Sequence, residues 1–294
     1  MSLIRRHELK TKVGIGIIGK GFVGNAVYNG FSAQTGFSSD IFIYDKDPMK
    51  STHSLEEVVS GSDFIFISVP TPSNADGSIN IDSISSVVKE ISKAKDKSKP
   101  IILIRSTIIP GTTESISKSY PELKIVFNPE FLTERSAALD FISQNRVILG
   151  GPQDLTSEVG ALYRSRFGSS MPIIETDYAT AEFIKYMNNT FFATKVSFMN
   201  DMYKLSQKVG VSWDDAVEGF IRDGRIGHSH IQVPGHDGKL GFGGSCFPKD
   251  VKALLFFAEQ LGIDLNVLSG AWQTNLEVRP EKDWENLKGR SIIE

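Results

Sequence analysis

The sequence contains only one cysteine, Cys246, and only five histidines in 294 residues. A single cysteine excludes a disulfide within the chain, which fits a protein from a reducing compartment. Three of the histidines, His228, His230 and His236, stand beside glycines in a stretch that we expect to be a loop. They have no obvious carboxylate neighbour, so we expect no metal site.

The chain also lacks long hydrophobic runs and an excess of charge of one sign. No apolar run approaches the length of about 20 residues that a membrane-spanning helix needs. Its 32 basic and 35 acidic residues are well mixed, with a formal net charge of -3. Met1 to Lys12 is basic, but no sustained apolar stretch follows it as in a signal peptide. We expect a soluble, cytoplasmic protein that binds neither nucleic acid nor membrane.

Apolar residues make up 40% of the chain, which is enough to build a large core and two domains. Up to about Gly151, short apolar runs alternate with helical patterns. Several runs are apolar on both faces, as in strands covered by helices on each side. This alternation predicts an α/β domain, a doubly wound Rossmann-like parallel sheet over residues 1–172. The predicted strands are VGIGIIG, IFIYD, DFIFISVP, IILIRST, KIVFNPE and RVILGG.

After Pro172 we expect no further strands. Asp177 to Val209 contains neither proline nor glycine and has apolar residues at helical spacing, before Gly210 ends the pattern. A helix of roughly thirty residues would be about 45 Å long, too long for one small domain. It predicts the spine of an all-helical second domain over residues 173–280, and a homodimer contact. Further helices are predicted at WDDAVEGFIR, at DVKALLFFAEQLG and near the C-terminus.

The first chemical signal is the stretch GKGFVG, which contains Gly19, Gly21 and Gly24. A GxGxxG pattern alone is weak evidence, because a tight turn between a strand and a helix would also explain it. Here it follows an apolar strand and opens a helical pattern, and Asp45 follows 21 residues after Gly24. That spacing predicts a dinucleotide site in which the carboxylate accepts hydrogen bonds from the adenosine ribose. A carboxylate there favours NAD over NADP, whose 2′-phosphate it would repel.

Polar residues follow several of the predicted strands, as VPTP, RST and NPEFLTE. Ligands of doubly wound sheets lie beyond the carboxyl ends of the strands, although turns use the same residue types. Glu130 and Glu134 are four apart at the start of an expected helix, so both can face one site. One could act as a base while the other orients water or substrate. Favourable charges at a helix start are the alternative interpretation.

On the predicted long helix, Lys185 and Asn189 are also four residues apart. A solvated helix face would explain such a pair. Their neighbours are largely apolar and aromatic, however, so a partly buried ammonium and amide are expected. Those groups suit a developing oxyanion.

Cys246 stands in GFGGSCFPKD, between glycines that let the backbone approach a ligand and a predicted helix start at Pro248. A helix N-terminus and the cation of Lys249 both favour the thiolate, which is the nucleophilic form. A structural cysteine would be expected within an apolar stripe, which is absent here. Together with a nicotinamide site, a nucleophilic cysteine predicts two hydride transfers, from alcohol to aldehyde and from thiohemiacetal to thioester, before water releases an acid.

Seven motifs in order resemble those of the UDP-glucose 6-dehydrogenase and GDP-mannose dehydrogenase family. They are GKGFVG, SVPTP, RSTIIPGTT, NPEFLTE, AEFIKYMNNTFF, RIG and GFGGSCFPKD. The resemblance runs from about Val13 into the last helix. It implies an NAD-dependent, four-electron oxidation of a nucleotide sugar, with UDP-glucose the leading candidate.

The resemblance also implies residue roles. Cys246 would be the thioester nucleophile, Asp250 would assist the cysteine and water, and Lys185 with Asn189 would stabilise the oxyanion. Thr107 and Glu130 would serve the water and general-base apparatus. The cofactor-binding residues would be Gly19, Gly21, Phe22, Val23, Gly24, Asp45, Thr71, Thr107 and Glu134. The substrate-binding residues would be Glu130, Phe131, Leu132, Lys185, Asn189, Arg225, Phe242 and Gly243. In a homodimer built on the long helix, Arg225 would reach the sugar bound to the neighbouring subunit.

One departure from the family pattern concerns the nucleotide. Family members carry a third domain that grips the nucleotide of the substrate, and residues 281–294 resemble only the linker to that domain and its first strand. Two alternatives therefore stay open. The β-hydroxyacid dehydrogenases share the Rossmann domain, a long helix and a Lys/Asn pair, but perform one two-electron oxidation. The other alternative is a catalytically idle module that binds NAD or sugar.

Overall fold

The computed structural model describes residues 12–97 and 99–293. The first eleven residues of the basic stretch Met1–Lys12 lie outside that part of the chain. The chain divides into two compact units, and each is described by itself below. The first comprises Met1–Pro70 and Asp82–Phe183, and the second comprises Thr71–Ile81 and Ile184–Glu294. The domain boundaries proposed from the sequence stay a prediction.

The first unit contains a seven-stranded sheet in the order β2-β1-β3-β4-β5-β6-β7. Neighbouring strands are parallel, except that β5 and β6 meet antiparallel through the pair Phe127 and Gly150. The predicted Rossmann-like α/β fold and all six predicted strands are confirmed. The strands are β1 (Val13–Ile18), β2 (Ser39–Tyr44), β3 (Phe64–Ile67), β4 (Ile101–Ile104), β5 (Lys124–Phe127), β6 (Val147–Gly150) and β7 (Ile173–Thr176).

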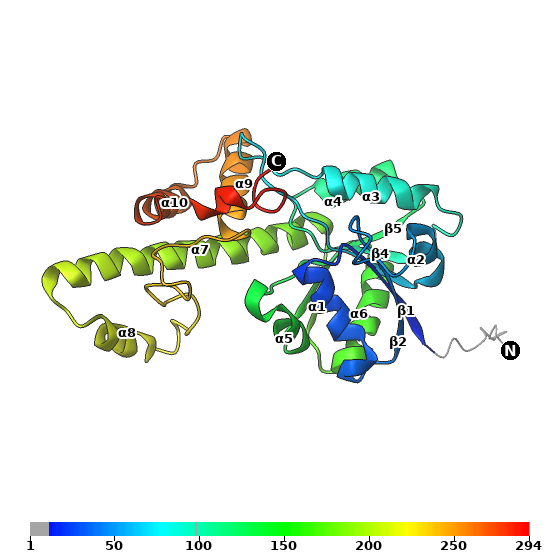
Figure 1. Ribbon diagram of the computed structural model, residues 1–294, viewed down its shortest axis with the longest axis horizontal. Helices are drawn as coiled ribbons and strands as arrows, with labels where there is room; N and C mark the ends of the chain where they lie inside the picture. The colour runs from blue at the N-terminus through cyan, green and yellow to red at the C-terminus, as the bar shows by residue number, and fades with distance from the viewer. Residues whose placement is uncertain (1–11, 98, 294) are drawn as a thin grey trace. The chain divides into compact units, whose positions relative to one another are not determined.

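Helices cover both faces of this sheet (Figure 1). One face carries α1 (Phe22–Phe31), α5 (Ala137–Ile142) and α6 (Gln153–Phe167), and the other carries α2 (Leu55–Gly61), α3 (Asp82–Lys93) and α4 (Thr112–Ser119). Short 3-10 turns, η1 (Ala33–Thr35) and η2 (Glu134–Ser136), complete the unit. Phe31 of α1 is fully buried and its ring contacts those of Phe66, Phe141 and Tyr163. Burial on both faces explains why the central strands are continuously apolar.

The expectation that strands stop after Pro172 is wrong. Ile173–Thr176 forms β7, which pairs in parallel with β6 at the edge of the sheet. The segment has four residues and is at most half-buried, so its apolar signal is short. An edge strand has one free side and needs no continuous apolar run.

The long helix is confirmed as α7 (Tyr178–Val209), which has 32 residues. Gly210 follows with φ +73°, a left-handed conformation that glycine adopts readily at a helix end. The boundary between the two units falls after Phe183, inside this helix. Beyond it, the second unit contains α8 (Trp213–Ile221), α9 (Phe247–Gln260), α10 (Asn266–Val278) and η3 (Asp283–Asn286).

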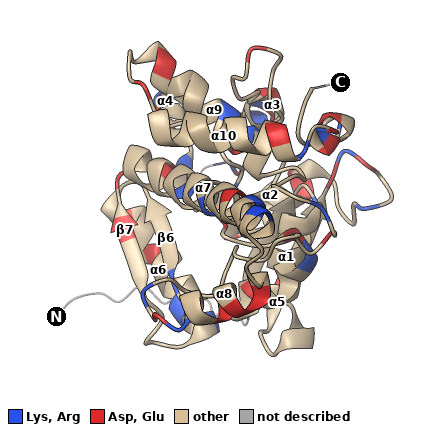
Figure 2. Cartoon of the chain, turned by 90° about the vertical axis from the view of Figure 1, so that its left-hand side faces the viewer, with Lys and Arg blue, Asp and Glu red and all other residues tan. Residues whose placement is uncertain are grey.

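The helices predicted at WDDAVEGFIR and DVKALLFFAEQLG are thus confirmed, although α9 begins at Phe247. Asp214 and Asp215 lie in the first turn of α8, whose acidic residues are red in Figure 2. Negative charge is favourable there because the helix dipole is positive at its N-terminus. Within the described residues, no helix is both long and apolar enough to span a bilayer.

Candidate active site

The glycine loop between β1 and α1 brings three chain segments of the first unit close together. Gly19 has φ +88°, and a Cβ on it would lie 2.7 Å from the carbonyl oxygen of Ser68. A Cβ on Gly24 would lie 2.0 Å from the carbonyl oxygen of Gly19. Both positions therefore require glycine, because the loop packs directly on the end of β3 and on the first turn of α1.

Gly21 differs from these two glycines, because a Cβ there would meet no atom within 4 Å. It is the N-cap of α1, with no capping side chain and no acidic residue in the first turn. Phe22 and Val23 follow, half-buried, in that turn. The N–H groups that begin a helix favour anions. The loop therefore fits the pyrophosphate of a dinucleotide, with open space at Gly21 for the approach.

Asp45 lies directly after β2, where the ribose-binding carboxylate was predicted. Its Oδ2 accepts a hydrogen bond from the Lys20 N–H (2.6 Å), and its Oδ1 accepts one from the Asp47 N–H (2.9 Å). The backbone of Asp45 is held by Ser51, whose hydroxyl donates to the Asp45 carbonyl oxygen at 2.8 Å. The carboxylate is therefore anchored beside the glycine loop, as a ribose acceptor should be.

The carboxyl ends of β4 and β5 are joined by a buried polar network. Arg105 donates from one guanidinium nitrogen to Asn128 Oδ1 (2.6 Å) and to the Tyr163 hydroxyl (3.0 Å). Tyr163 also donates to Asn128 Oδ1 at 2.6 Å, and the Asn128 amide donates to the Ile148 carbonyl oxygen. Arg105 belongs to RST and Asn128 to NPEFLTE, so the network fixes the backbone next to the buried candidates Thr107 and Glu130.

The helix expected at Glu130–Glu134 is absent. Residues 128–133 form a loop, Glu134 begins the short turn η2, and α5 starts only at Ala137. Glu130 is buried, and its Oε2 accepts a hydrogen bond from the N–H of Leu132 (2.7 Å). This local bond stabilises a turn in place of a helix. The two glutamates are therefore not helical neighbours; Glu134 is exposed, and Phe131 and Leu132 between them are half-buried.

In the second unit, a buried carboxylate joins α7 to α9. Asp250 is 1% exposed; its Oδ2 accepts from the Asn189 amide (2.7 Å) and its Oδ1 from the Lys249 ammonium (2.5 Å). Lys185 lies one turn before Asn189 on α7 and is also buried. Three predicted site residues, Lys185, Asn189 and Asp250, thus occur in one buried polar region of this unit.

Cys246 is the N-cap of α9 and is half-buried. Pro248 occupies the first turn, as predicted, and the Asp250 N–H donates to the Cys246 carbonyl oxygen at 2.9 Å. The helix start favours a thiolate, as the sequence indicated. Lys249, the cation expected to help, forms a buried ion pair with Asp250. Its charge is therefore shared with that carboxylate.

Four further predicted residues also lie in the second unit. Phe242 is buried and Gly243 half-buried in the loop before Cys246. Thr71, predicted to bind the cofactor, is buried in the segment Thr71–Ile81. Arg225 is 89% exposed at its side chain and pairs with Asp223. The hydrogen bonds that Arg225 donates to the Asp223 side chain raise the pKa of Arg225.

Two buried charged residues were missed by sequence reasoning. Glu182 on α7 is fully buried and accepts hydrogen bonds from the N–H of Gly111 (2.6 Å), the N–H of Thr113 (2.8 Å) and the Thr113 hydroxyl (2.5 Å). It thereby binds the N-terminus of α4, in the stretch that follows Thr107. Arg279 at the end of α10 is 3% exposed. The only signal for Arg279 was an acidic residue, Asp283, four positions later.

Comparison with known families identifies both parts of the chain. Residues 43–166 match the NAD binding domain of the UDP-glucose/GDP-mannose dehydrogenase family, and residues 179–277 match the central domain of the same family. The expectation of NAD as cofactor is thereby confirmed. The two matches include the ends of strands β2 to β6, nearly all of α7, and Cys246.

Two curated relatives support this family assignment. A UDP-glucose 6-dehydrogenase, AglM, of Haloferax volcanii is 32% identical over 263 residues, which cover 84% of this chain and 59% of the relative. A second, YwqF of Bacillus subtilis, is 34% identical over 230 residues, 76% of this chain and 50% of the relative. The chain thus spans between half and three-fifths of the length of these two relatives.

A solved structure shows the same fold. The UDP-glucose dehydrogenase from the hyperthermophilic archaeon Pyrobaculum islandicum superposes with a TM-score of 0.78 at 26% sequence identity. The match covers 94% of this chain and 70% of that one.

Proposed function

We propose, from the premise that the chain belongs to the UDP-glucose/GDP-mannose dehydrogenase family, that it oxidises the primary alcohol of a nucleotide sugar to a carboxylate. UDP-glucose is the first substrate to test, because the curated relatives AglM and YwqF carry that name. The observation that carries the proposal is the arrangement on α9. Cys246 begins the helix, and one turn later the buried Asp250 is held by Asn189 and Lys249.

Bound at the glycine loop, NAD supplies a hydride acceptor for each of two oxidations. The first oxidation leaves an aldehyde, and the Cys246 thiolate adds to its carbon, forming a C–S bond while the oxygen takes up a proton. The second oxidation removes hydride from that carbon and leaves a thioester on Cys246. Water then attacks the thioester, the C–S bond breaks, and the acid leaves with the thiol restored. The balance is one water consumed and two NADH formed per sugar.

The residues of the second unit suit the charges that develop in these steps. Lys185 and Asn189 stabilise the oxyanion formed when the thiolate adds and when water attacks. An asparagine amide has two N–H donors, so Asn189 can bind Asp250 and still stabilise an oxyanion. Asp250 assists the cysteine and the water. Thr107 and Glu130 are both buried at the strand ends of the first unit, and the family resemblance assigns them to the water and general-base apparatus.

The test counts NADH per sugar for the wild type and for Cys246→Ser. Purified protein and NAD are mixed in turn with UDP-glucose, GDP-mannose and UDP-N-acetylmannosamine. We expect two NADH per sugar with one of them, and loss of complete turnover in the serine variant. One NADH per substrate would favour a β-hydroxyacid-type reaction, and NAD binding without NADH would favour an idle module. Undiminished acid formation by Cys246→Ser would refute the thioester mechanism.

We also propose that two copies of the chain associate through α7. Its apolar side chains Met187, Phe191, Phe198, Leu205 and Val209 are each more than half exposed. They recur four or seven residues apart, the spacing of a face that packs on another helix. Sedimentation analysis should show a dimer that Phe191→Glu weakens. A wild type that sediments as a monomer at micromolar concentration would contradict this.

The compartment is proposed to be the cytoplasm, on the basis of the single cysteine and the balanced charge. Fractionation of cells that express the protein tests this, and recovery in a secreted or membrane fraction would contradict it.

A further inference from the structure

We propose that Arg279 is a positioning residue for Cys246. It would act by fixing the loop Asp237–Gly243, which leads into the N-terminus of α9. The proposal deepens the proposed function and rests on it for the role of the cysteine, whereas the structural argument depends only on contacts within the second unit.

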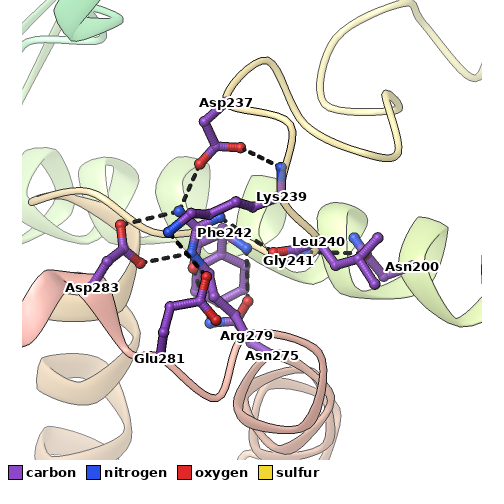
Figure 3. Close-up of polar contacts among 10 residues, drawn as sticks. All are labelled: Asn200, Asp237, Lys239, Leu240, Gly241, Phe242, Asn275, Arg279, Glu281 and Asp283. Carbon is purple, nitrogen blue, oxygen red and sulfur yellow. Dashed lines mark hydrogen bonds and ion pairs between the residues drawn. The ribbon is translucent and has the colours of Figure 1, made fainter.

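Arg279 connects both ends of this loop to the end of α10 (Figure 3). Its guanidinium donates to Asp237 Oδ2 (2.6 Å), to both carboxylate oxygens of Asp283 (2.7 and 3.0 Å) and to the carbonyl oxygen of Leu240 (3.2 Å). Burial lowers the pKa of Arg279, but the hydrogen bonds that it donates to the two aspartates outweigh this effect and raise the pKa above its usual value. The guanidinium therefore stays charged, and all three of its nitrogens donate hydrogen bonds.

Two asparagines hold the backbone of the same loop (Figure 3). Asn275 on α10 accepts a hydrogen bond from the Phe242 N–H (2.7 Å) and donates to the Phe242 carbonyl oxygen (3.0 Å). Asn200 on α7 accepts from the Gly241 N–H (2.9 Å). Asn275 is fully buried and Asn200 is 2% exposed. Side chains from α7 and α10 thus specify the backbone conformation of Gly241 and Phe242.

The glycines of the loop are required by this packing. A Cβ on Gly243 would lie 2.6 Å from a guanidinium nitrogen of Arg279 and 2.6 Å from Asp283 Oδ1. A Cβ on Gly241 would lie 2.4 Å from Asn275 Oδ1. The loop backbone therefore rests directly on the Arg279–Asp283 pair, and any side chain at Gly243 would displace that pair.

The position of the loop determines where α9 begins. Only Gly244 and Ser245 separate Gly243 from Cys246. On the other side of the loop, Phe242 is buried in a cluster with Ala193 of α7 and Val251 of α9. The loop is thus held on one side by the hydrophobic contacts of Phe242 and on the other by the polar contacts of Arg279. Only two residues separate the end of the loop from Cys246.

A purely structural role explains this arrangement less well. Desolvation offsets much of the attraction in a buried ion pair, so well-packed apolar residues would stabilise the fold as well. What the planar guanidinium adds is geometry, because it binds two aspartates and a carbonyl oxygen in one plane over Gly243. A displacement of about 1 Å at a reacting group can cost roughly 100-fold in rate.

The test measures how readily Cys246, the single cysteine of the chain, reacts with an alkylating reagent. The rate of Cys246 alkylation by iodoacetamide, followed by mass spectrometry, is compared for the wild type, Arg279→Lys and Gly243→Ala. Lysine keeps the charge but loses the planar set of donors. We expect both variants to be alkylated severalfold faster, because a loosened loop exposes the half-buried thiol. Binding of NAD, which involves the glycine loop of the first unit, should be unchanged.

Two control variants separate local from general effects. Ser197→Ala removes a buried hydrogen bond to the Ala271 carbonyl oxygen (2.6 Å), elsewhere in the same unit. Glu281→Gln breaks the exposed pair with Lys239 of the same loop (3.0 Å). Both should be alkylated at the wild-type rate. If Arg279→Lys does not fold, Asp237→Asn, which leaves Arg279 and Asp283 in place, should still accelerate alkylation.

Where the chain oxidises a sugar, Arg279→Lys should lower kcat by about 10- to 100-fold and leave KM nearly unchanged. The alkylation result does not depend on turnover, so a protein that forms no NADH contradicts the proposed function without affecting this comparison. Wild-type alkylation rates in folded Arg279→Lys and Asp237→Asn would overturn the positioning role. Equal acceleration in Ser197→Ala would overturn it as well, since the effect would then be general loosening.

Discussion

The two units of the molecule hold their buried charges in different ways. In the first unit, the guanidinium of Arg105 donates to Asn128 and Tyr163 and lies over the ring of Phe141, 5.5 Å from its centroid. These partners are an amide, a hydroxyl and an aromatic ring, all of them uncharged. In the same unit the carboxylate of Glu182 accepts hydrogen bonds from two backbone N–H groups and a hydroxyl.

In the second unit, the buried charges of Arg279, Lys249 and Asp250 occur in ion pairs. Arg279 binds Asp237 and Asp283, and Lys249 binds Asp250. Three of these residues, Asp237, Lys249 and Asp250, lie within nine positions of Cys246 in the sequence. In the unit that carries the candidate nucleophile, these buried charges therefore have partners of opposite charge.

The pKa directions express this difference. Burial raises the pKa of Glu182, and its hydrogen bonds to Thr113 and Gly111 offset the effect only in part. The hydrogen bond from Arg279 lowers the pKa of Asp283, although burial opposes it. For Asp237 burial is the largest influence and raises the pKa, but Arg279 and the Lys239 N–H together bring it below its usual value. Changing the pH should therefore affect the two units oppositely, and removing a buried cation should destabilise the second unit more than the first.

The largest expected effect is the difference between Arg279→Met and Arg105→Met. Loss of Arg279 leaves two carboxylates without their cation, and should cost near the lower end of roughly 3–5 kcal/mol, because both are about one-third exposed. Loss of Arg105 leaves the neutral side chains of Asn128 and Tyr163 without one hydrogen-bond donor. It should lower the free energy of unfolding by about 1–3 kcal/mol. Urea denaturation at neutral pH measures both. Equal costs would mean that the charge of the partners does not matter.

Much of the fold behind this comparison could be predicted from the sequence. Six strands and α7 were predicted because burial on both faces and helical spacing leave long, regular patterns. Gly210 and Pro248 marked a helix end and a helix start correctly for the same reason, since their backbone preferences are local. The exposed edge strand β7 left no such pattern and was missed.

The candidate site was predictable only where its chemistry is local. The glycine loop, Asp45 and Cys246 follow from spacing along the chain. The hydrogen-bond partners within the site cannot be predicted in this way, because they are far apart in the sequence. Asn189 and Asp250 are separated by 61 positions, and Phe242 and Asn275 by 33. The error at Glu130 has a similar cause. Spacing of four indicated a helix, but the bond from Leu132 to Glu130 stabilises a turn.

The second prediction concerns Asp283 and acid. Its folded pKa lies below the usual value of 3.8. The stability that it contributes is therefore fully present above pH 3.8 and is lost as the pH falls through the lower, folded pKa. Asp283→Asn should cost about 1.5–3 kcal/mol at neutral pH, and the difference from the wild type should shrink below about pH 4. Denaturation curves between pH 3 and pH 7 check this; a constant difference would contradict it.

The third prediction concerns Glu182 and has the opposite sign. Its folded pKa is raised above the usual value of 4.5. Its favourable contribution is therefore fully present below pH 4.5 and is lost as the pH rises through the folded pKa. Relative to Glu182→Gln, the wild type should gain stability on acidification, because a neutral carboxyl group is buried at less cost than a carboxylate. The same denaturation series measures it. A wild type that loses stability relative to the glutamine variant at low pH would contradict the contrast between the units.

The smallest effect is expected for Glu281→Gln, which breaks the ion pair with Lys239 in the loop that Arg279 fixes. Both side chains are more than 40% exposed, so water screens the pair and its loss should cost only about 0–1 kcal/mol. This variant tests whether the loss of a charge destabilises the second unit because the charge is buried or merely because it lies near the loop. Asp283→Asn removes one carboxylate from the same region, but a buried guanidinium then loses a partner. A cost for Glu281→Gln as large as that for Asp283→Asn, measured in the same urea titration, would show that proximity to the loop is sufficient. A small cost would assign the difference between the units to buried charge.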